Sequence, residues 1–162
     1  MELSIALATQ NVETSSGGPF ASLIVEIASN KILCAAVNLV VEQNQSWLHG
    51  ERLAFSLGQK TLGTYNFPKG QYRLVSSAQM CIACWAESLG TGIAEIVVSA
   101  TADDIEALTP FKEGILPETW REQLNCQGIK LIENVCREKG KLPLKKYGKT
   151  GPAYFDAGSK SK

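Results

Sequence analysis

The feature that most constrains the fold is a pair of short motifs that open two predicted helices. His49, the one histidine of the chain, lies in His49-Gly50-Glu51, and Cys81 and Cys84 form a Cys-x-x-Cys motif further along. Imidazole and thiolate are both ligands that zinc accepts in a tetrahedral site. One ion held by all three side chains ties the openings of both helices to the same place.

The number of these ligands predicts a catalytic metal site. Two cysteines on the first turn of a helix can point at one ion, and the N–H groups there favour thiolate. One histidine and two cysteines supply three ligands, so the fourth position is open to water, as in catalytic zinc sites. Glu51, two residues after the histidine, can reach that water without binding the metal and can move its proton to a leaving group.

Two other interpretations of the cysteines remain open at this point. A structural zinc site needs a fourth ligand from Cys34, Cys126 or Cys136, and none of these has a partner at zinc-finger spacing. A thioredoxin-like redox pair leaves the motif around His49 unexplained.

Composition limits the class of partner. The 162 residues carry 16 basic and 16 acidic side chains, so the chain lacks the basic excess of proteins that bind nucleic acid through its phosphates. No apolar run approaches the roughly 20 residues that span a bilayer, so we expect no membrane partner. The odd count of five cysteines and the absence of a secretory signal argue against a disulfide framework and predict a cytoplasmic setting.

Strands alternate with helices along most of the chain, which predicts an α/β sandwich around a mostly parallel sheet that opens with an antiparallel hairpin. We expect one domain over residues 1–162. The predicted strands are 20–27, 32–41, 72–76, 93–99 and 128–132. The predicted helices are 2–10, 49–63, 81–89, one that starts at Thr101 with Asp104 completing a capping box, and 117–126. No element is predicted beyond 132.

Over residues 17–132 the sequence resembles the guanine deaminase branch of the cytidine-deaminase-like superfamily. The resemblance rests on Gly17-Gly-Pro-Phe20, Asn38, His49-Gly50-Glu51, Cys81-x-x-Cys84, Asp103-Asp-Ile-Glu-Ala107 and Phe111-Lys-Glu-Gly114. It implies a three-layer α/β/α sandwich with a central mixed five-stranded sheet. It also implies a zinc-dependent hydrolytic deaminase of a small amino-heterocycle, with guanine to xanthine plus ammonia as the leading reaction.

The resemblance also implies roles for individual residues. Zinc is held by His49, Cys81 and Cys84; Glu51 is the proton shuttle; Glu113 is a second carboxylate that helps to move protons; Asn38 hydrogen-bonds the heterocycle and Phe20 packs against it. The family is usually dimeric, so we expect a homodimer. Residues 133–162 are expected to complete this pocket or that of the partner, through Tyr147, Tyr154 or Phe155.

The chain departs from the family at the metal motifs. Gln79-Met80 stands where Glu-Pro is usual, and Gly50 where alanine is usual. Proline fixes φ and removes an N–H, so Met80 makes the approach to the cysteines less rigid. These departures leave the substrate open among guanine, aminotriazines, pterins and cytosine.

Two further hypotheses concern the function itself. A tRNA adenosine deaminase would use the same chemistry, but the zero net charge and the Phe111-Lys-Glu-Gly114 block argue against it. A zinc scaffold that has lost catalysis would bind metal and turn over no amine.

Overall fold

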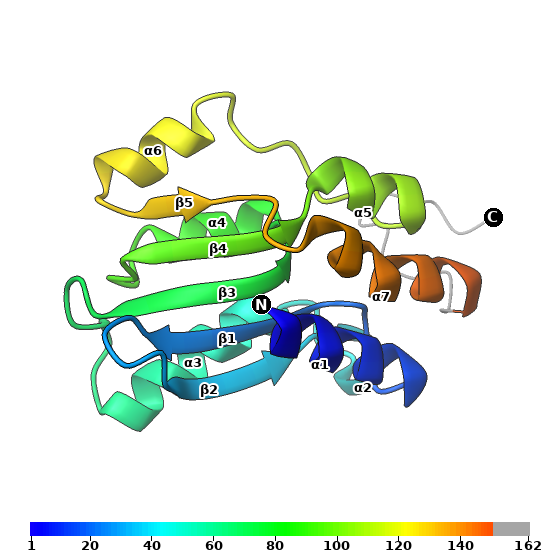
Figure 1. Ribbon diagram of the computed structural model, residues 1–162, viewed down its shortest axis with the longest axis horizontal. Helices are drawn as coiled ribbons and strands as arrows, with labels where there is room; N and C mark the ends of the chain where they lie inside the picture. Colours follow the sequence, from blue (N-terminus) through cyan, green and yellow to red (C-terminus); the bar gives the residue numbers. More distant parts are fainter. Residues whose placement is uncertain (151–162) are drawn as a thin grey trace.

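The computed structural model describes residues 1–150, and its centre is one mixed sheet of five strands (Figure 1). The strand order is β2-β1-β3-β4-β5. β1 pairs antiparallel with β2 and β3, whereas β3–β4 and β4–β5 are parallel. The strands are β1 (Ala21–Glu26), β2 (Ile32–Val37), β3 (Tyr72–Ala78), β4 (Glu95–Ala100) and β5 (Lys130–Ile132). The predicted architecture and its opening hairpin are therefore confirmed.

Both faces of the sheet are apolar. Neighbouring side chains of a strand point to opposite sides of the sheet, and in the central strands both sets are apolar. Leu23, paired with Val75, belongs to one buried cluster, and Ile24, paired with Leu74, belongs to the other. A sheet that is apolar on both faces needs a layer of helices on each side.

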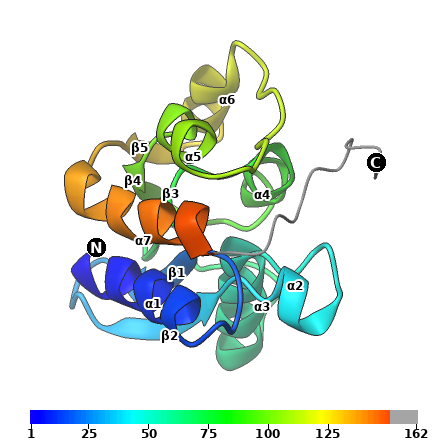
Figure 2. The ribbon, with the colours of Figure 1, turned by 90° about the vertical axis from the view of Figure 1, so that its right-hand side faces the viewer.

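Helices supply both layers (Figures 1 and 2). One face is covered by α3 (Gly50–Leu62), α4 (Ile82–Ser88) and α6 (Trp120–Cys126). The other face is covered by α1 (Glu2–Glu13) and α7 (Arg137–Thr150), which lie side by side, and α5 (Ala102–Leu108) packs against α7. Within residues 1–150, no helix combines the length and hydrophobicity needed to cross a membrane.

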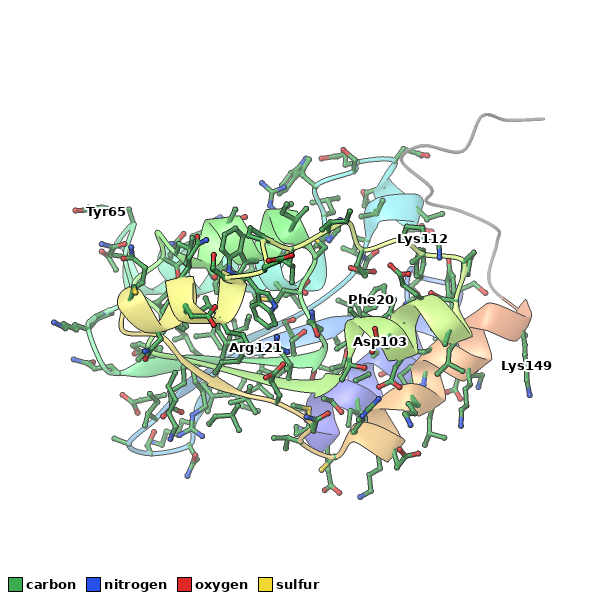
Figure 3. All side chains as sticks on the ribbon, turned by 90° about the horizontal axis from the view of Figure 1, so that it is seen from above. Phe20, Tyr65, Asp103, Lys112, Arg121 and Lys149 are labelled. Carbon is green, nitrogen blue, oxygen red and sulfur yellow. The ribbon has the colours of Figure 1, made fainter. Side chains whose placement is uncertain are left out.

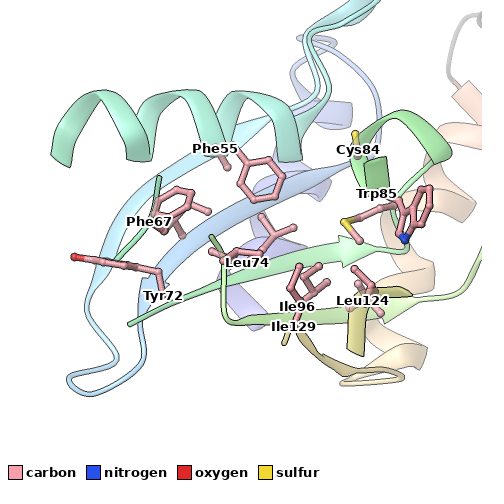
Figure 4. Packing of buried hydrophobic residues seen from close by; sticks show 14 of the residues in the cluster. Phe55, Phe67, Tyr72, Leu74, Cys84, Trp85, Ile96, Leu124 and Ile129 are labelled. Atoms are coloured by element: carbon pink, nitrogen blue, oxygen red, sulfur yellow. The ribbon is translucent and has the colours of Figure 1, made fainter. Parts of the chain in front are cut away.

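Large side chains fill the space between the sheet and the α3–α4–α6 layer (Figure 4). Phe55 of α3 and Leu124 of α6 are fully buried against Leu74 and Ile96 of the sheet. Cys84 and Trp85 of α4 belong to the same cluster. Cys81 belongs to this cluster as well, so both cysteines of the motif are anchored in the main core.

The predicted capping box opens α5. The Thr101 hydroxyl accepts from the Asp104 N–H at 3.3 Å, and the Asp104 carboxylate accepts from the Thr101 N–H at 3.0 Å. Arg137 at the start of α7 donates to both oxygens of the same carboxylate, at 2.7 and 3.0 Å. The guanidinium holds the pKa of Asp104 well below its usual range. One carboxylate thus caps α5 and fixes the start of α7.

The structure corrects the predicted end of the second strand. β2 stops at Val37 instead of continuing to residue 41, and a short helix, α2 (Val40–Gln43), follows it. The Asn38 side chain accepts from the Val40 N–H at 3.2 Å, and the Leu39 N–H donates to the Leu48 carbonyl at 2.9 Å. These bonds turn the chain away from the sheet, although valines favour a strand.

The helix α7 was not predicted, because glycine and proline interrupt its sequence. Pro143 lies inside it, and the glycines allow close packing. A Cβ on Gly140 would lie 2.3 Å from the Ser99 hydroxyl oxygen, and one on Gly148 would lie 2.0 Å from the Leu108 carbonyl oxygen. The residues that lower helix propensity are the ones that let α7 dock.

We expect Gly148→Ala to lower the free energy of unfolding by about 1 to 3 kcal/mol, because a new methyl group meets backbone that cannot rotate away. Urea unfolding measures the change. Lys149→Ala, at an exposed position of the same helix, is the control. A Gly148→Ala protein as stable as the wild type would contradict the close contact between α7 and Leu108.

Candidate functional site

The functional side chains gather at one end of the sheet. Asn38 follows β2, Gln79 follows β3 and Thr101 follows β4. Phe20 precedes β1, which runs antiparallel to β2 and β3, so all four residues lie at the same end of the strands. The carboxyl ends of parallel strands are where α/β proteins commonly bind ligands. Figure 3 shows Phe20 near α5 at this end, far from the exposed Tyr65 at the other.

The histidine and the two cysteines converge as predicted. His49 is the N-cap residue of α3, Cys81 is the N-cap residue of α4, and Cys84 lies on the first turn of α4. The Cys81 Sγ lies 3.5 Å from the His49 Nδ1 and 3.6 Å from the Cys84 Sγ. The ligand atoms all fall within 4.8 Å of one another.

These distances match the edges of a tetrahedron around a metal ion. Bonds of about 2.3 Å to sulfur and 2.0 to 2.1 Å to nitrogen give edges of about 3.8 Å between sulfurs and 3.6 Å between sulfur and nitrogen. Among the residues described, this is the only such cluster of histidine, cysteine and carboxylate side chains. The three residues can therefore hold a metal ion.

The other cysteines do not join the cluster. Cys34 donates its S–H to the Ala54 carbonyl oxygen at 3.3 Å, and Cys126 and Cys136 are exposed. The part of the chain that the structure describes thus offers no fourth cysteine for a closed structural zinc site. The position opposite the three ligands is left for a small molecule.

The two sulfurs are hydrogen-bonded to each other. This hydrogen bond, and then the one with His49, lower the pKa of the Cys81 thiol to about 4, which favours a thiolate at Cys81. The hydrogen bond to that thiolate, and burial, raise the pKa of Cys84. The same thiolate raises the pKa of His49. A site with one ready thiolate and one thiol that releases its proton on metal binding suits a divalent cation.

Glu51 is a buried carboxyl group beside this cluster. It lies on the first turn of α3 and is 6% exposed. Burial, followed by the charge of Cys81, raises its pKa to about 7. A carboxyl with a pKa near neutrality can both take and give a proton at working pH.

A cavity adjoins the cluster and collects most of the predicted site residues. It is lined by Gly18, Phe20, Asn38, Val40, Val41, His49, Glu51, Gln79, Phe111, Glu113 and Tyr147. Phe20, Asn38, Glu51 and Glu113, predicted from separate motifs, thus face one space with His49. Gln79 and Phe111 also line the cavity, although the sequence predicted no contact with the substrate for either. Both lie within or beside the motifs that carried the resemblance.

An aromatic wall closes one side of the cavity. The rings of Phe20 and Phe111 have centroids 5.4 Å apart, and Phe111 stacks on Tyr147 at 5.0 Å. Tyr147 comes from α7, so residues 133–150 contribute to the cavity of the same chain. Tyr154 and Phe155 lie outside the described residues.

Glu113 supplies a second carboxyl group to the cavity from the loop after α5. Burial, followed by the negative charges of Cys81 and Glu51, raises its pKa to about 8. Two carboxyl groups that border one cavity and are both held near neutrality are typical of sites that transfer protons.

Solved structures similar to this chain include a guanine deaminase from Nitrosomonas europaea. It is 31% identical, with a TM-score of 0.86 over 92% of this chain and 82% of that one. A structure in complex with 2,6-diaminopurine is also 31% identical, with a TM-score of 0.87 over 96% of this chain and 83% of that one. The chain belongs to the guanine deaminase branch of the cytidine-deaminase-like superfamily.

A more distant solved structure has a similar fold. A guanine deaminase from Bacillus subtilis is 24% identical, with a TM-score of 0.61 over 65% of each chain. No protein-family model and no curated protein matched the chain.

The pKa of Glu113 predicts a pH-dependent contribution to the stability of the metal-free protein. Between about pH 5 and pH 8, the folded state keeps a proton on this carboxyl that the unfolded state has lost, so the contribution of Glu113 to stability falls as the pH rises. The stability of wild type relative to Glu113→Gln should decline over this range. Urea unfolding at several pH values measures the decline.

Glu118→Gln, at an exposed position, controls for the change of charge. A wild-type advantage over Glu113→Gln that stays constant from pH 5 to pH 8 would mean that Glu113 is already ionised in the folded protein over this range.

Proposed function

We propose that the protein is a zinc-dependent guanine deaminase that converts guanine and water into xanthine and ammonia. The observation that carries the proposal is that the buried Glu51 lies beside three potential metal ligands, and that Glu51 and His49 line one cavity. The related structures bound to 2,6-diaminopurine and, in mutant form, to 8-azaguanine support a purine as the substrate.

Zinc suits the ligands, because it accepts imidazole and thiolate in a tetrahedron with an open fourth position. When bound, zinc lowers the pKa of a coordinated water to about 7 and so supplies a nucleophile at neutral pH. His49, Cys81 and Cys84 would hold it.

Glu51 is proposed to move the protons of the reaction. It accepts a proton as water adds to the ring carbon that bears the amino group. It then gives a proton to that amino group, which leaves as ammonia while the carbon becomes a carbonyl. Its burial keeps the pKa of the carboxyl near neutrality, where both transfers run without a large penalty.

Other cavity residues would position the ring. Asn38 offers an amide, and Phe20 with the rest of the aromatic wall offers flat apolar surface. With a pKa raised to about 8, the carboxyl of Glu113 can give a proton to a ring nitrogen as the carbon is attacked. It regains a proton from the added hydroxyl when that carbon becomes a carbonyl. Neutral groups around most of the cavity favour a neutral heterocycle over a charged ligand.

The proposal extends to the state of the protein in the cell: a single domain, in the cytoplasm, that works in purine breakdown as a homodimer. All five cysteines are free, which suits a reducing compartment. Near the cavity, Ile82 is 43% exposed, and Ile115, next to the Gly114 that faces Ile82, is 92% exposed. A second subunit that covers this apolar rim would remove it from water.

We expect zinc-loaded protein to release ammonia and xanthine from guanine, and Glu51→Gln to lower kcat by about 100- to 10,000-fold, because the proton carrier is lost. Ammonia is measured for guanine, aminotriazines, pterins, cytosine and tRNA. Glu122→Gln, at an exposed position, is the control and keeps full activity. Absence of ammonia release from all of these substrates would contradict the proposal. Ammonia release from tRNA or another ring amine, but not from guanine, would make that molecule the substrate in place of guanine.

The proposed metal ligands give a second expectation. Purified protein should carry one zinc ion, and Cys84→Ser should lose it, because a hydroxyl is a far weaker zinc ligand than a thiolate. Mass spectrometry of metals after gel filtration measures the content. Cys126→Ser, at an exposed cysteine outside the cluster, should keep its zinc. Equal metal content in both variants would place the ion elsewhere.

A further inference from the structure

Gln79 is a cavity residue to which the proposed mechanism gives no role. It directly follows β3, and its N–H donates to the Ala100 carbonyl at 2.8 Å, so its backbone is fixed beside the end of β4. Its side chain borders the same space as Glu51 and Glu113. The position is therefore rigid and lies next to the groups proposed to move protons.

The orientation of the Gln79 amide follows from one hydrogen bond. Its Oε1 accepts from the Ala102 N–H at 3.3 Å, on the first residue of α5. A backbone N–H only donates, so the oxygen must face it and the NH2 group must face away. Among residues 1–150, no side chain or carbonyl accepts from this NH2 group.

Asn38 shows the same arrangement. Its Oδ1 accepts from the Val40 N–H at 3.2 Å, which leaves its NH2 group as the part that can meet a ligand. The cavity thus presents two amide donors, each oriented by a backbone N–H. A molecule that fits needs hydrogen-bond acceptors on the edges that face Asn38 and Gln79.

A glutamate at position 79 would present the opposite polarity. Its carboxylate could still accept from the Ala102 N–H, but its second oxygen would also accept. It would add a third carboxyl group to a cavity that holds Glu51 and Glu113, and the repulsion between like charges would make ionisation of all three less favourable. Glutamine has the same shape as glutamate, but it presents an NH2 donor to the cavity where glutamate would present an acceptor oxygen.

We infer that Gln79 is a specificity-determining residue whose NH2 group donates a hydrogen bond to an acceptor atom of the substrate ring. This inference rests on the proposed function and narrows it: the substrates are ring amines that carry an oxo group or an unprotonated ring nitrogen away from the reacting amino group. Rings that present N–H or C–H at that edge bind less well, because they offer no acceptor to the NH2 group of Gln79.

The experiment compares wild type with Gln79→Glu on guanine and on two analogues that each lack one acceptor. These are 2,6-diaminopurine, with an amino group in place of the oxo group, and 7-deazaguanine, with a C–H group in place of a ring nitrogen. Values of kcat and KM come from ammonia release by zinc-loaded protein. Chromatography identifies the products, since diaminopurine has two amino groups.

Gln71→Glu is the matched control, because it makes the same change at an exposed residue before the opposite end of β3. Thermal unfolding and metal content establish that the variants are folded and loaded. Gln79→Met removes the donor without adding charge. If the glutamate variant does not fold, the same comparison of kcat/KM is made between wild type and Gln79→Met.

We expect Gln79→Glu to lower kcat/KM for guanine by about tenfold or more, mainly through KM, while one of the two analogues loses far less. The spared analogue identifies the acceptor atom. An equal loss on all three substrates, an equal loss in Gln71→Glu, or no loss at all would each overturn the role of Gln79. Failure of the proposed function is distinct, because it appears in the wild type as absence of ammonia from every purine.

Discussion

The arrangement of the whole molecule depends on the meeting of two helix starts. His49 and Cys81 are both N-cap residues, and Cys84 lies one turn further on, so the cluster exists only while α3 and α4 begin at the same edge of the sheet. The sheet order β2-β1-β3 brings these starts together, and Phe55 and Trp85 fix the helices to a shared core. Rigid packing behind the ligands keeps their geometry close to that of the bound state.

Hydrogen bonds from backbone N–H groups organise the rest of the cavity. They orient the amides of Asn38 and Gln79, while the carboxylate of Asp104 caps α5 and holds Arg137 of α7. The bonds of Gln79 with Ala102 and of Asp104 with Arg137 join elements that are distant in sequence. The bond of Asn38 with Val40 turns the chain out of the sheet after β2. Polar contacts at this end of the sheet thus orient the amides of the cavity, and apolar packing beneath them positions the three potential metal ligands.

The sequence predicted the sheet, the central helices and the convergence of His49 with Cys81 and Cys84, because apolar periodicity and ligand spacing are local signals. It did not predict α7, whose Gly140, Pro143 and Gly148 oppose a helix locally and fit only against β4 and α5. The short α2 was missed for a similar reason, since its valines favour a strand and a side-chain bond from Asn38 decides otherwise. The orientation of Gln79 depends on a partner 23 residues away, and no local pattern reveals that.

The position of Tyr147 in the aromatic wall has a consequence for how the protein matures during translation. All ligands and carboxyl groups of the site lie between residues 49 and 113, so they leave the ribosome well before α7. Until α7 docks through Arg137, Gly140 and Gly148, the cavity lacks the ring that stacks on Phe111. A nascent chain that takes up the proposed metal ion at this stage would do so before α7 closes its side of the cavity.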